Sequence, residues 1–214
     1  MTAVSTDQAR KAPGRRRGKL GDHVARIVSS LQAQVLRDPP RPEAVSALAR
    51  LRRGIGRAPG FDYTLETYLW VPDGLLDRRS ADRADNAEYA VHDAVTLYAL
   101  HQQSRREAMH VDGHGLGRAL ARLVHASDGP DGVRRRFAAL GTASTYTEGI
   151  YHLRSLVTML REHQFPIDYG LLADDLRRLR QPTRRADVQA AWGREFFRNR
   201  IDESTTQTQE ENAA

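Results

Sequence analysis

Arginine is the residue type in this chain whose abundance and spacing point to a binding site. The stretch 113–137 combines a glycine-rich start, a pair of arginines one helical turn apart and a triplet after a turn. A guanidinium presents a planar set of donors that fits phosphate oxygens in pairs, and N–H groups at a helix start also attract anions. The stretch therefore predicts a phosphate-holding site made by Arg118, Arg122, Arg134, Arg135 and Arg136.

Further arginines outside this stretch extend the predicted site. Three of them surround a glycine turn that follows a helix, and two others lie seven residues apart, on one face of a later helix. Cations also favour helix C-termini without binding any ligand, so the group at the glycine turn has a purely structural interpretation as well. The added candidates are Arg52, Arg53, Arg57, Arg154 and Arg161.

The net charge supports a polyanionic partner. The chain has 33 basic and 27 acidic residues and a formal charge of +6. Both lysines, Lys11 and Lys19, lie near the N-terminus, so every basic residue of the body that is not histidine is arginine. A G+C-rich genome would explain the preference for arginine over lysine, but it would not explain the surplus of positive charge. That surplus favours binding to nucleic acid.

The sequence contains no recognisable catalytic or metal-binding set. It has no cysteine, so thiolate nucleophiles, disulfides and cysteine-based zinc sites are excluded. The Glu-x-x-His pair of Glu107 and His110 occurs once, and the glycine pattern at 113–117 follows no strand, as a dinucleotide site would require. Asp174 and Asp175 are neighbours that point apart on a helix, and we expect them to be solvated. We predict no enzyme activity, no metal and no cofactor.

The elements that must position the arginines are all helical. Apolar residues recur at spacings of three and four, and no alternating pattern of useful length occurs. We therefore predict an all-α helical bundle of about eight to nine helices without a sheet. Thr147 is a candidate N-cap for the helix at 145–163, and Asp168 is predicted to cap the helix that follows it. The segment 58–84 is less regular. Its aromatic residues could stack on bases, although packing is the favoured interpretation. The main predicted helices span 19–37, 42–53, 86–103, 116–125 and 145–163, and three more carry the inward residues at 133–140, 171–179 and 188–196, the last of them ending near 198. Val91, Ala94, Val95 and Tyr98 form the apolar stripe of the helix 86–103.

Composition divides the chain into a domain and two tails. We expect 1–18 to be a disordered basic tail and 201–214 to be a disordered acidic tail, with the helical domain at 19–200. Candidate lobes within that domain are 19–110 and 113–200. No apolar run reaches the roughly 20 residues of a membrane helix, and no secretory signal is apparent. We expect a cytoplasmic protein with no membrane partner.

The order of several motifs resembles the CasB family, the small subunit of the type I-E CRISPR Cascade surveillance complex. Each motif is weak alone, but their order and spacing together are more specific, and the resemblance covers about 20–200. The motifs are Ala-Arg-Leu-Arg-Arg-Gly at 49–54, Leu-Gly-Arg-Ala-Leu at 116–120, Val-Arg-Arg-Arg-Phe at 133–137, His-Leu-Arg-Ser-Leu-Val at 152–157, Pro-Ile-Asp-Tyr at 166–169 and Trp-Gly-Arg-Glu-Phe at 192–196.

The resemblance implies a helical, non-catalytic subunit that pairs with a second copy inside Cascade. Its implied partners are crRNA, the target and displaced DNA strands, and the other Cascade subunits, and its implied role is to stabilise the R-loop. Binding through phosphates would be independent of sequence. Seven of the ten candidate arginines occupy the matching basic positions, whereas Arg57, Arg122 and Arg161 are added from helical geometry.

Two other functions remain open from the residues. One is a stand-alone basic helical protein that binds DNA, although no helix-turn-helix is convincing and the arginines are spread over several helices. The other is a structural bundle whose arginines contact acidic proteins.

Overall fold

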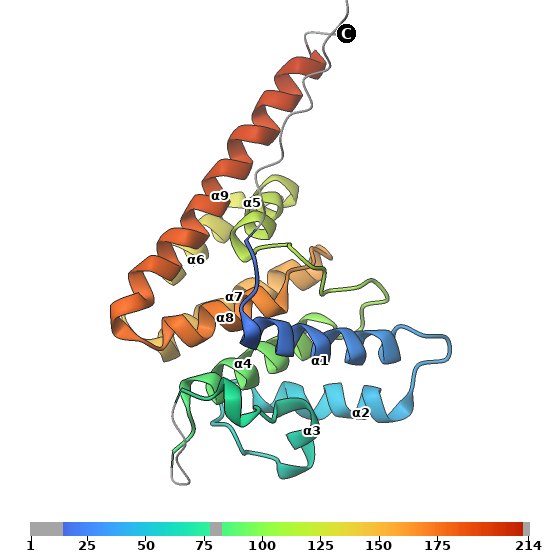
Figure 1. Cartoon of the computed structure of the whole chain (residues 1–214). Coiled ribbons are helices and arrows are strands. Elements are labelled where there is room, and N and C mark those ends of the chain that lie inside the picture. The colour runs from blue at the N-terminus through green and yellow to red at the C-terminus, as the bar shows by residue number, and fades with distance from the viewer. Residues whose placement is uncertain (1–14, 78–82, 212–214) are drawn as a thin grey trace, which may run out of the picture.

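The protein is an all-α bundle, and its computed structural model describes residues 15–77 and 83–211, with side chains up to Arg198. Within these residues there are nine α-helices, with three short 3-10 turns between α2 and α4, and the only β-type contact is an isolated bridge between His110 and Ile167. Figure 1 shows their arrangement. The α-helices are α1 (Lys19–Val35), α2 (Pro42–Leu51), α3 (Glu66–Leu69), α4 (Asn86–His101), α5 (Leu116–Ala126), α6 (Pro130–Thr142), α7 (Tyr146–Glu162), α8 (Tyr169–Leu179) and α9 (Pro182–Glu211).

Helix α4 is the central element of the bundle. Every residue from Ala90 to Ala99 is buried, so the helix is covered on all sides rather than along the one stripe that its sequence suggested. Its start is fixed by a capping box, in which Asp85 accepts from the Ala87 backbone N–H at 2.7 Å and the Asp85 N–H donates to Glu88 at 2.5 Å. The small side chains of α4 let α1, α2, α7 and α8 pack closely around it.

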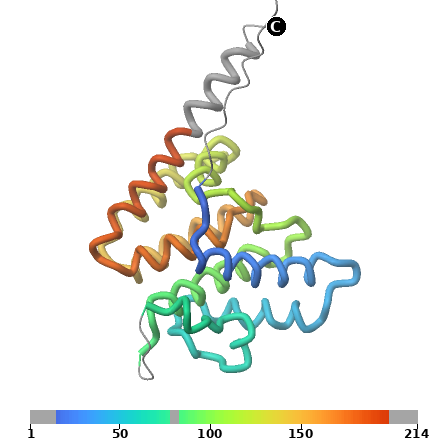
Figure 2. Tube along the Cα trace, in the orientation of Figure 1, coloured from blue at the N-terminus to red at the C-terminus, as the bar shows by residue number. Residues whose placement is uncertain are grey.

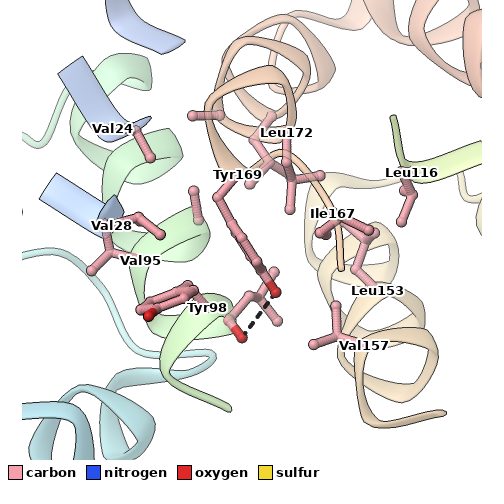
Figure 3. Packing of buried hydrophobic residues seen from close by; sticks show 14 of the residues in the cluster. Val24, Val28, Val95, Tyr98, Leu116, Leu153, Val157, Ile167, Tyr169 and Leu172 are labelled. Carbon is pink, nitrogen blue, oxygen red and sulfur yellow. Dashed lines mark hydrogen bonds between the residues drawn. The ribbon is translucent and has the colours of Figure 1, made fainter. Parts of the chain in front are cut away.

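One hydrophobic cluster joins the two candidate lobes. It contains residues of α1 and α4 from 19–110 together with residues of α5, α7, α8 and α9 from 113–200. Figure 3 shows Tyr169 of α8 lying between these sets, where its hydroxyl donates to the Leu97 carbonyl oxygen at 3.3 Å. The hydroxyl also lies 3.0 Å from His101 Nδ1. The lobes therefore share a core, and α1 lies against α8 from the other end of the chain (Figure 2).

The glycines at 113–117 have a packing role that the sequence did not reveal. Gly113 has a positive φ of 75°, which suits a turn before α5. A Cβ on Gly117 would overlap the Trp192 carbonyl oxygen, and one on Gly115 would overlap the Glu195 carboxylate. The absence of side chains at these two positions therefore lets α5 approach α9 closely.

Apart from the end of α9, which was predicted near residue 198, the helix bounds agree with the predicted ones to within a few residues. The side chain that caps α7 is Thr145, which accepts from the Glu148 N–H at 3.2 Å, rather than Thr147. Asp168 caps α8 as predicted, accepting from Gly170 and Leu171. Helix α9 continues to Glu211 and so extends into the segment 201–214 that we expected to be disordered. A helix that already has a stable start needs no new nucleus to lengthen.

The end of the predicted basic tail is ordered. Residues 15–18 run along α8 and α9 before α1 begins, and Arg15 forms ion pairs with Asp175 and Glu195. Arg17 pairs with Asp112 at 2.8 Å. The prediction of disorder was therefore wrong for 15–18, because carboxylates of the body bind these arginines, while 1–14 lies outside the described residues. Within the described part of the chain, no helix is long and apolar enough to cross a membrane.

Candidate nucleic-acid interface

The arginines after α2 extend from a turn that α4 holds in place. The 3-10 turn η1 (Arg52–Gly54) continues α2, and His92 of α4 donates from Nε2 to the Gly54 carbonyl oxygen at 2.9 Å. A Cβ on Gly54 would overlap the Phe61 ring, so only glycine fits here without movement. Arg53 is exposed and Arg52 is half-buried beside this fixed turn.

The structure brings Arg52 together with Arg161, which is far away in the sequence. Burial lowers the pKa of the Arg52 guanidinium, and the nearby charges of Arg161 and Arg53 lower this pKa further. Arg161 lies in the last turn of α7 and donates from Nη1 to Gln103 Oε1 at 3.1 Å. Two predicted candidates thus lie close enough to repel each other electrostatically.

Arg105 is a member of the same group, and our sequence reasoning missed it. Burial lowers the pKa of His101 to about 3, and the charges of Arg161 and Arg105 also lower it. The Nε atoms of Arg105 and Arg161 are buried and have no hydrogen-bond partner among the described residues. Arg105 follows α4 in a connecting segment, where helical spacing gives no indication of its direction. We call Arg52, Arg53, Arg105 and Arg161 the α7-end cluster.

The α7-end cluster has no neutralising carboxylate. Among the described residues no Asp or Glu forms an ion pair with any of its four members, and the charges that shift the pKa of Arg52 are those of other arginines. Three other half-buried arginines, Arg15, Arg17 and Arg177, each have an acidic partner, whereas half-buried Arg180 instead donates to Asn86 and lies over the Tyr89 ring. A group of three half-buried arginines and one exposed arginine without a carboxylate is the arrangement expected of an anion site.

A second group lies where α6 crosses α7. Arg134, Arg135 and Arg136 are all exposed, where the inward positions of Val133 and Leu140 predict that at least two of the three point outward. Arg136 donates from Nε to Ser155 Oγ at 3.1 Å, and Ser155 follows the exposed Arg154 on α7. Arg134 is paired with Asp131 at 2.9 Å. We call Arg135, Arg136 and Arg154 the α6–α7 cluster.

Arg118 and Arg122 of α5 have no described contact with the arginines of either cluster. The Arg122 guanidinium lies over the Phe165 ring, 4.8 Å from its centroid, in the connection between α7 and α8. Arg118 is half-buried, and no described contact joins it to the other candidates. Arg57 is exposed and lines a pocket with Arg53 and Tyr63. The ten candidates are thus distributed over two clusters and their surroundings.

A carboxylate already lies at the start of α5, where we predicted that N–H groups could attract a phosphate. The Gly117 N–H donates to the Glu195 carboxylate at 3.1 Å. The negative charge of Glu195 beside this helix start disfavours a phosphate there.

Three side chains of the types that can bind a metal ion lie together, and the Arg17 guanidinium contacts two of them. The ligand atoms of His110, Asp112 and Asp168 lie within 4.8 Å of one another. Arg17 Nη1 lies 2.8 Å from Asp112 Oδ1 and 3.5 Å from Asp168 Oδ1. Asp168 also accepts from the Gly113 N–H at 2.8 Å. These residues tie the N-terminal segment to the start of α8.

The expected solvation of Asp174 and Asp175 is wrong. Asp175 is buried and accepts from the Trp192 indole N–H at 2.7 Å as well as from Arg15. Asp174 accepts from the backbone N–H groups of Gly18 and Gly21 at 2.6 and 2.9 Å. Both carboxylates point toward partners that are distant in sequence, which spacing within one helix cannot reveal.

Comparison with known proteins agrees with this all-helical, arginine-rich architecture. The structure is similar to the crystal structure of CasB from Thermobifida fusca, with a TM-score of 0.66 and 38% sequence identity over 85% of this chain and 99% of that one. It is also similar to a CRISPR-associated protein of the Cse2 family from Thermus thermophilus, with a TM-score of 0.59 and 27% identity over 83% of this chain and 97% of that one. No curated protein sequence gives a match.

The family model for CRISPR-associated protein Cse2 matches residues 47–197. The chain therefore belongs to the Cse2 family of CRISPR-associated proteins, whose solved relatives include proteins named CasB. The match begins just before the arginines of η1 and ends within α9, so it contains both arginine clusters.

Proposed function

We propose that this chain is the non-catalytic small subunit of a type I-E Cascade complex and holds the phosphate backbones of crRNA, target DNA and the displaced strand. The observation that carries the proposal is the α7-end cluster, in which four arginines lie together without a carboxylate among the described residues. Family membership supports the assignment to a CRISPR complex.

The charge arrangement explains why a phosphate backbone would bind there. Guanidinium groups of the cluster carry donors that the described residues leave unused, and neighbouring cations repel one another. A phosphate beside the cluster would accept from the solvent-facing N–H groups of its arginines and would offset the repulsion between them. R-loop formation exchanges base pairs of nearly equal stability, so contacts to the backbone can shift that balance.

The first test removes two charges of the cluster. Arg52→Gln combined with Arg161→Gln should lower the affinity of the full chain for single-stranded oligonucleotides of any sequence by about tenfold or more, measured by fluorescence anisotropy. The slope of log affinity against log salt should fall by roughly 1 to 2. The matched control is Arg184→Gln, an exposed arginine on α9 near Asp187.

Different outcomes separate this proposal from the two alternatives. Unchanged affinity in the double variant would contradict the assignment of the site. A marked preference of the wild-type chain for one duplex sequence would support a stand-alone DNA-binding protein. Failure to bind nucleic acid, combined with binding to acidic proteins, would support a structural bundle. Co-purification with a guide RNA and other Cascade subunits would support the complex itself.

A further inference from the structure

Two exposed tyrosines lie beside the arginines described above. Tyr63 is 82% exposed and Tyr151 is 72% exposed, the highest values among the large hydrophobic side chains that remain at the described surface. Other tyrosines are covered, as Tyr98 and Tyr169 illustrate in the core. A large part of each exposed ring is therefore available to a partner.

Tyr151 lies on α7 next to the α6–α7 cluster. Arg154 is three residues further along the helix and Ser155 is four residues further, so all three share one face. Arg136 reaches that face from α6, since it donates to Ser155 Oγ. The Tyr151 ring is therefore bordered by exposed guanidinium groups from two helices.

Tyr63 has a similar position near the α7-end cluster. It lines a pocket with Arg53, Arg57 and the pair of Arg50 and Asp62. Hydrogen bonds from Arg50 hold the pKa of Asp62 at about 2, and Thr64 Oγ1 also donates to this carboxylate, at 2.5 Å. The one carboxylate among the residues that line this pocket thus has partners already, and Arg53 and Arg57 leave an excess of positive charge beside the ring.

We propose that Tyr63 and Tyr151 are stacking platforms for unpaired bases, and that each makes the arginine-rich surface around it selective for single-stranded over double-stranded nucleic acid. Aromatic rings stack on exposed bases whatever their sequence, while neighbouring cations bind the phosphates. In a duplex the base faces are covered by neighbouring base pairs. This inference rests on the proposed function and adds a preference that phosphate contacts alone would not produce.

The experiment compares the full chain with Tyr63→Leu and Tyr151→Leu, and with the corresponding phenylalanine variants, which keep the ring. Three probes of equal length separate the contributions: a single-stranded oligonucleotide, the same strand with abasic sites, and a duplex. The matched control is Trp70→Leu. Trp70 is 58% exposed, but its pocket is lined by Glu66, Asp73 and Glu88, with Arg83 the arginine among them.

Each leucine variant should bind the single strand roughly 5- to 50-fold more weakly, whereas the phenylalanine variants and Trp70→Leu should bind like the wild type. Loss of affinity in the leucine variants should be absent with the abasic strand and the duplex, and the salt slope should stay the same. Equal losses with the abasic strand would overturn the stacking role.

Three further outcomes would also overturn the inference, and they can be told apart. If both leucine variants bind the single strand like the wild type while Arg52→Gln with Arg161→Gln binds weakly, stacking is wrong and the proposed function stands. If the leucine variants change sedimentation of the protein but not its binding of nucleic acid, the rings form a contact between protein chains. If the wild type binds none of the three probes, the proposed function itself fails.

Discussion

Asp93 is a carboxyl group placed inside the most buried helix of the protein. Only 4% of its surface is exposed, and its main partner is Tyr146, whose hydroxyl donates to Asp93 Oδ2 at 2.6 Å. Burial raises the pKa of Asp93 to about 6, although the Tyr146 hydrogen bond and the charge of Arg180 act in the opposite direction. Asp93 therefore links the stability of α4 and α7 to pH.

The pH dependence follows from the raised pKa of Asp93. The folded state holds the proton more tightly than the unfolded state, so the stabilisation is fully present below about pH 4 and is lost as pH rises through 6. Between about pH 4 and pH 7 the free energy of unfolding of the wild type should fall by about 2 kcal/mol relative to that of Asp93→Asn. Urea unfolding of both proteins at several pH values measures this difference, and parallel pH profiles would contradict it.

The individual site residues show how far sequence reasoning reaches. The outward direction of Arg134 to Arg136 was predictable, because it depends on the register of a single helix. The meeting of Arg52, Arg105 and Arg161 was not, because it depends on how α2, α4 and α7 pack. The partners of Asp175 were hidden for the same reason, since one of them, Arg15, is at the other end of the chain.

At the scale of elements, the contact between α5 and α9 depends on missing side chains. Gly117 faces the backbone of α9 at Trp192, and Glu195 of α9 accepts from the Gly117 N–H. The position of Trp192 is fixed in turn by its hydrogen bond to Asp175 of α8. The three helices are therefore held at one point by a glycine, an indole and two carboxylates.

Gly117→Ala should destabilise the fold, because the added methyl group would overlap the Trp192 carbonyl oxygen and force α5 away from α9. We expect a loss of roughly 1 to 3 kcal/mol in the free energy of unfolding. Gly193→Ala is the matched control on α9, since a Cβ there meets nothing within 4 Å. It should be stabilising by up to about 1 kcal/mol, the difference in helix propensity. Equal effects of the two substitutions in thermal unfolding would refute the close-packing interpretation.

The helices themselves were largely predictable, and their packing was not. Apolar spacing and caps are local signals, so the bounds of α1, α5 and α8 followed from them. The same signals suggested one buried stripe on α4, whereas the helix is buried on all sides because α1, α2, α3, α7 and α8 pack around it. The glycine pattern at 113–117 could not be assigned to close packing without knowledge of its neighbour α9.

At the scale of the whole molecule, the N-terminal segment joins parts that the chain order separates. Arg15 pairs with Asp175 of α8 and Glu195 of α9, and Arg17 pairs with carboxylates of the segment before α5 and of the α8 cap. Burial lowers the pKa of the Arg15 guanidinium, but Asp175 and Glu195 raise it by more, so the pKa of Arg15 is raised overall. The segment fastens α1, α8 and α9 to one another.

Adjacent arginines provide a matched test of this fastening. Arg15→Gln leaves the buried Asp175 without its cation, and we expect the free energy of unfolding to fall by roughly 2 to 4 kcal/mol. Arg16→Gln removes the same charge from an exposed side chain and should change stability by less than about 0.5 kcal/mol. Chemical unfolding of both variants measures the difference. Similar stabilities would show that the N-terminal segment is not a structural element.

The packing of α1 against α8 has a consequence for the order in which the protein can form. Synthesis delivers α1 early, but the helix that covers its apolar residues Leu20, Val24 and Val28, and the carboxylates that bind Arg15, are made near the end. The native arrangement therefore closes only after most of the chain has left the ribosome. Folding is a late event of the whole chain, and contacts between such distant segments make it slow.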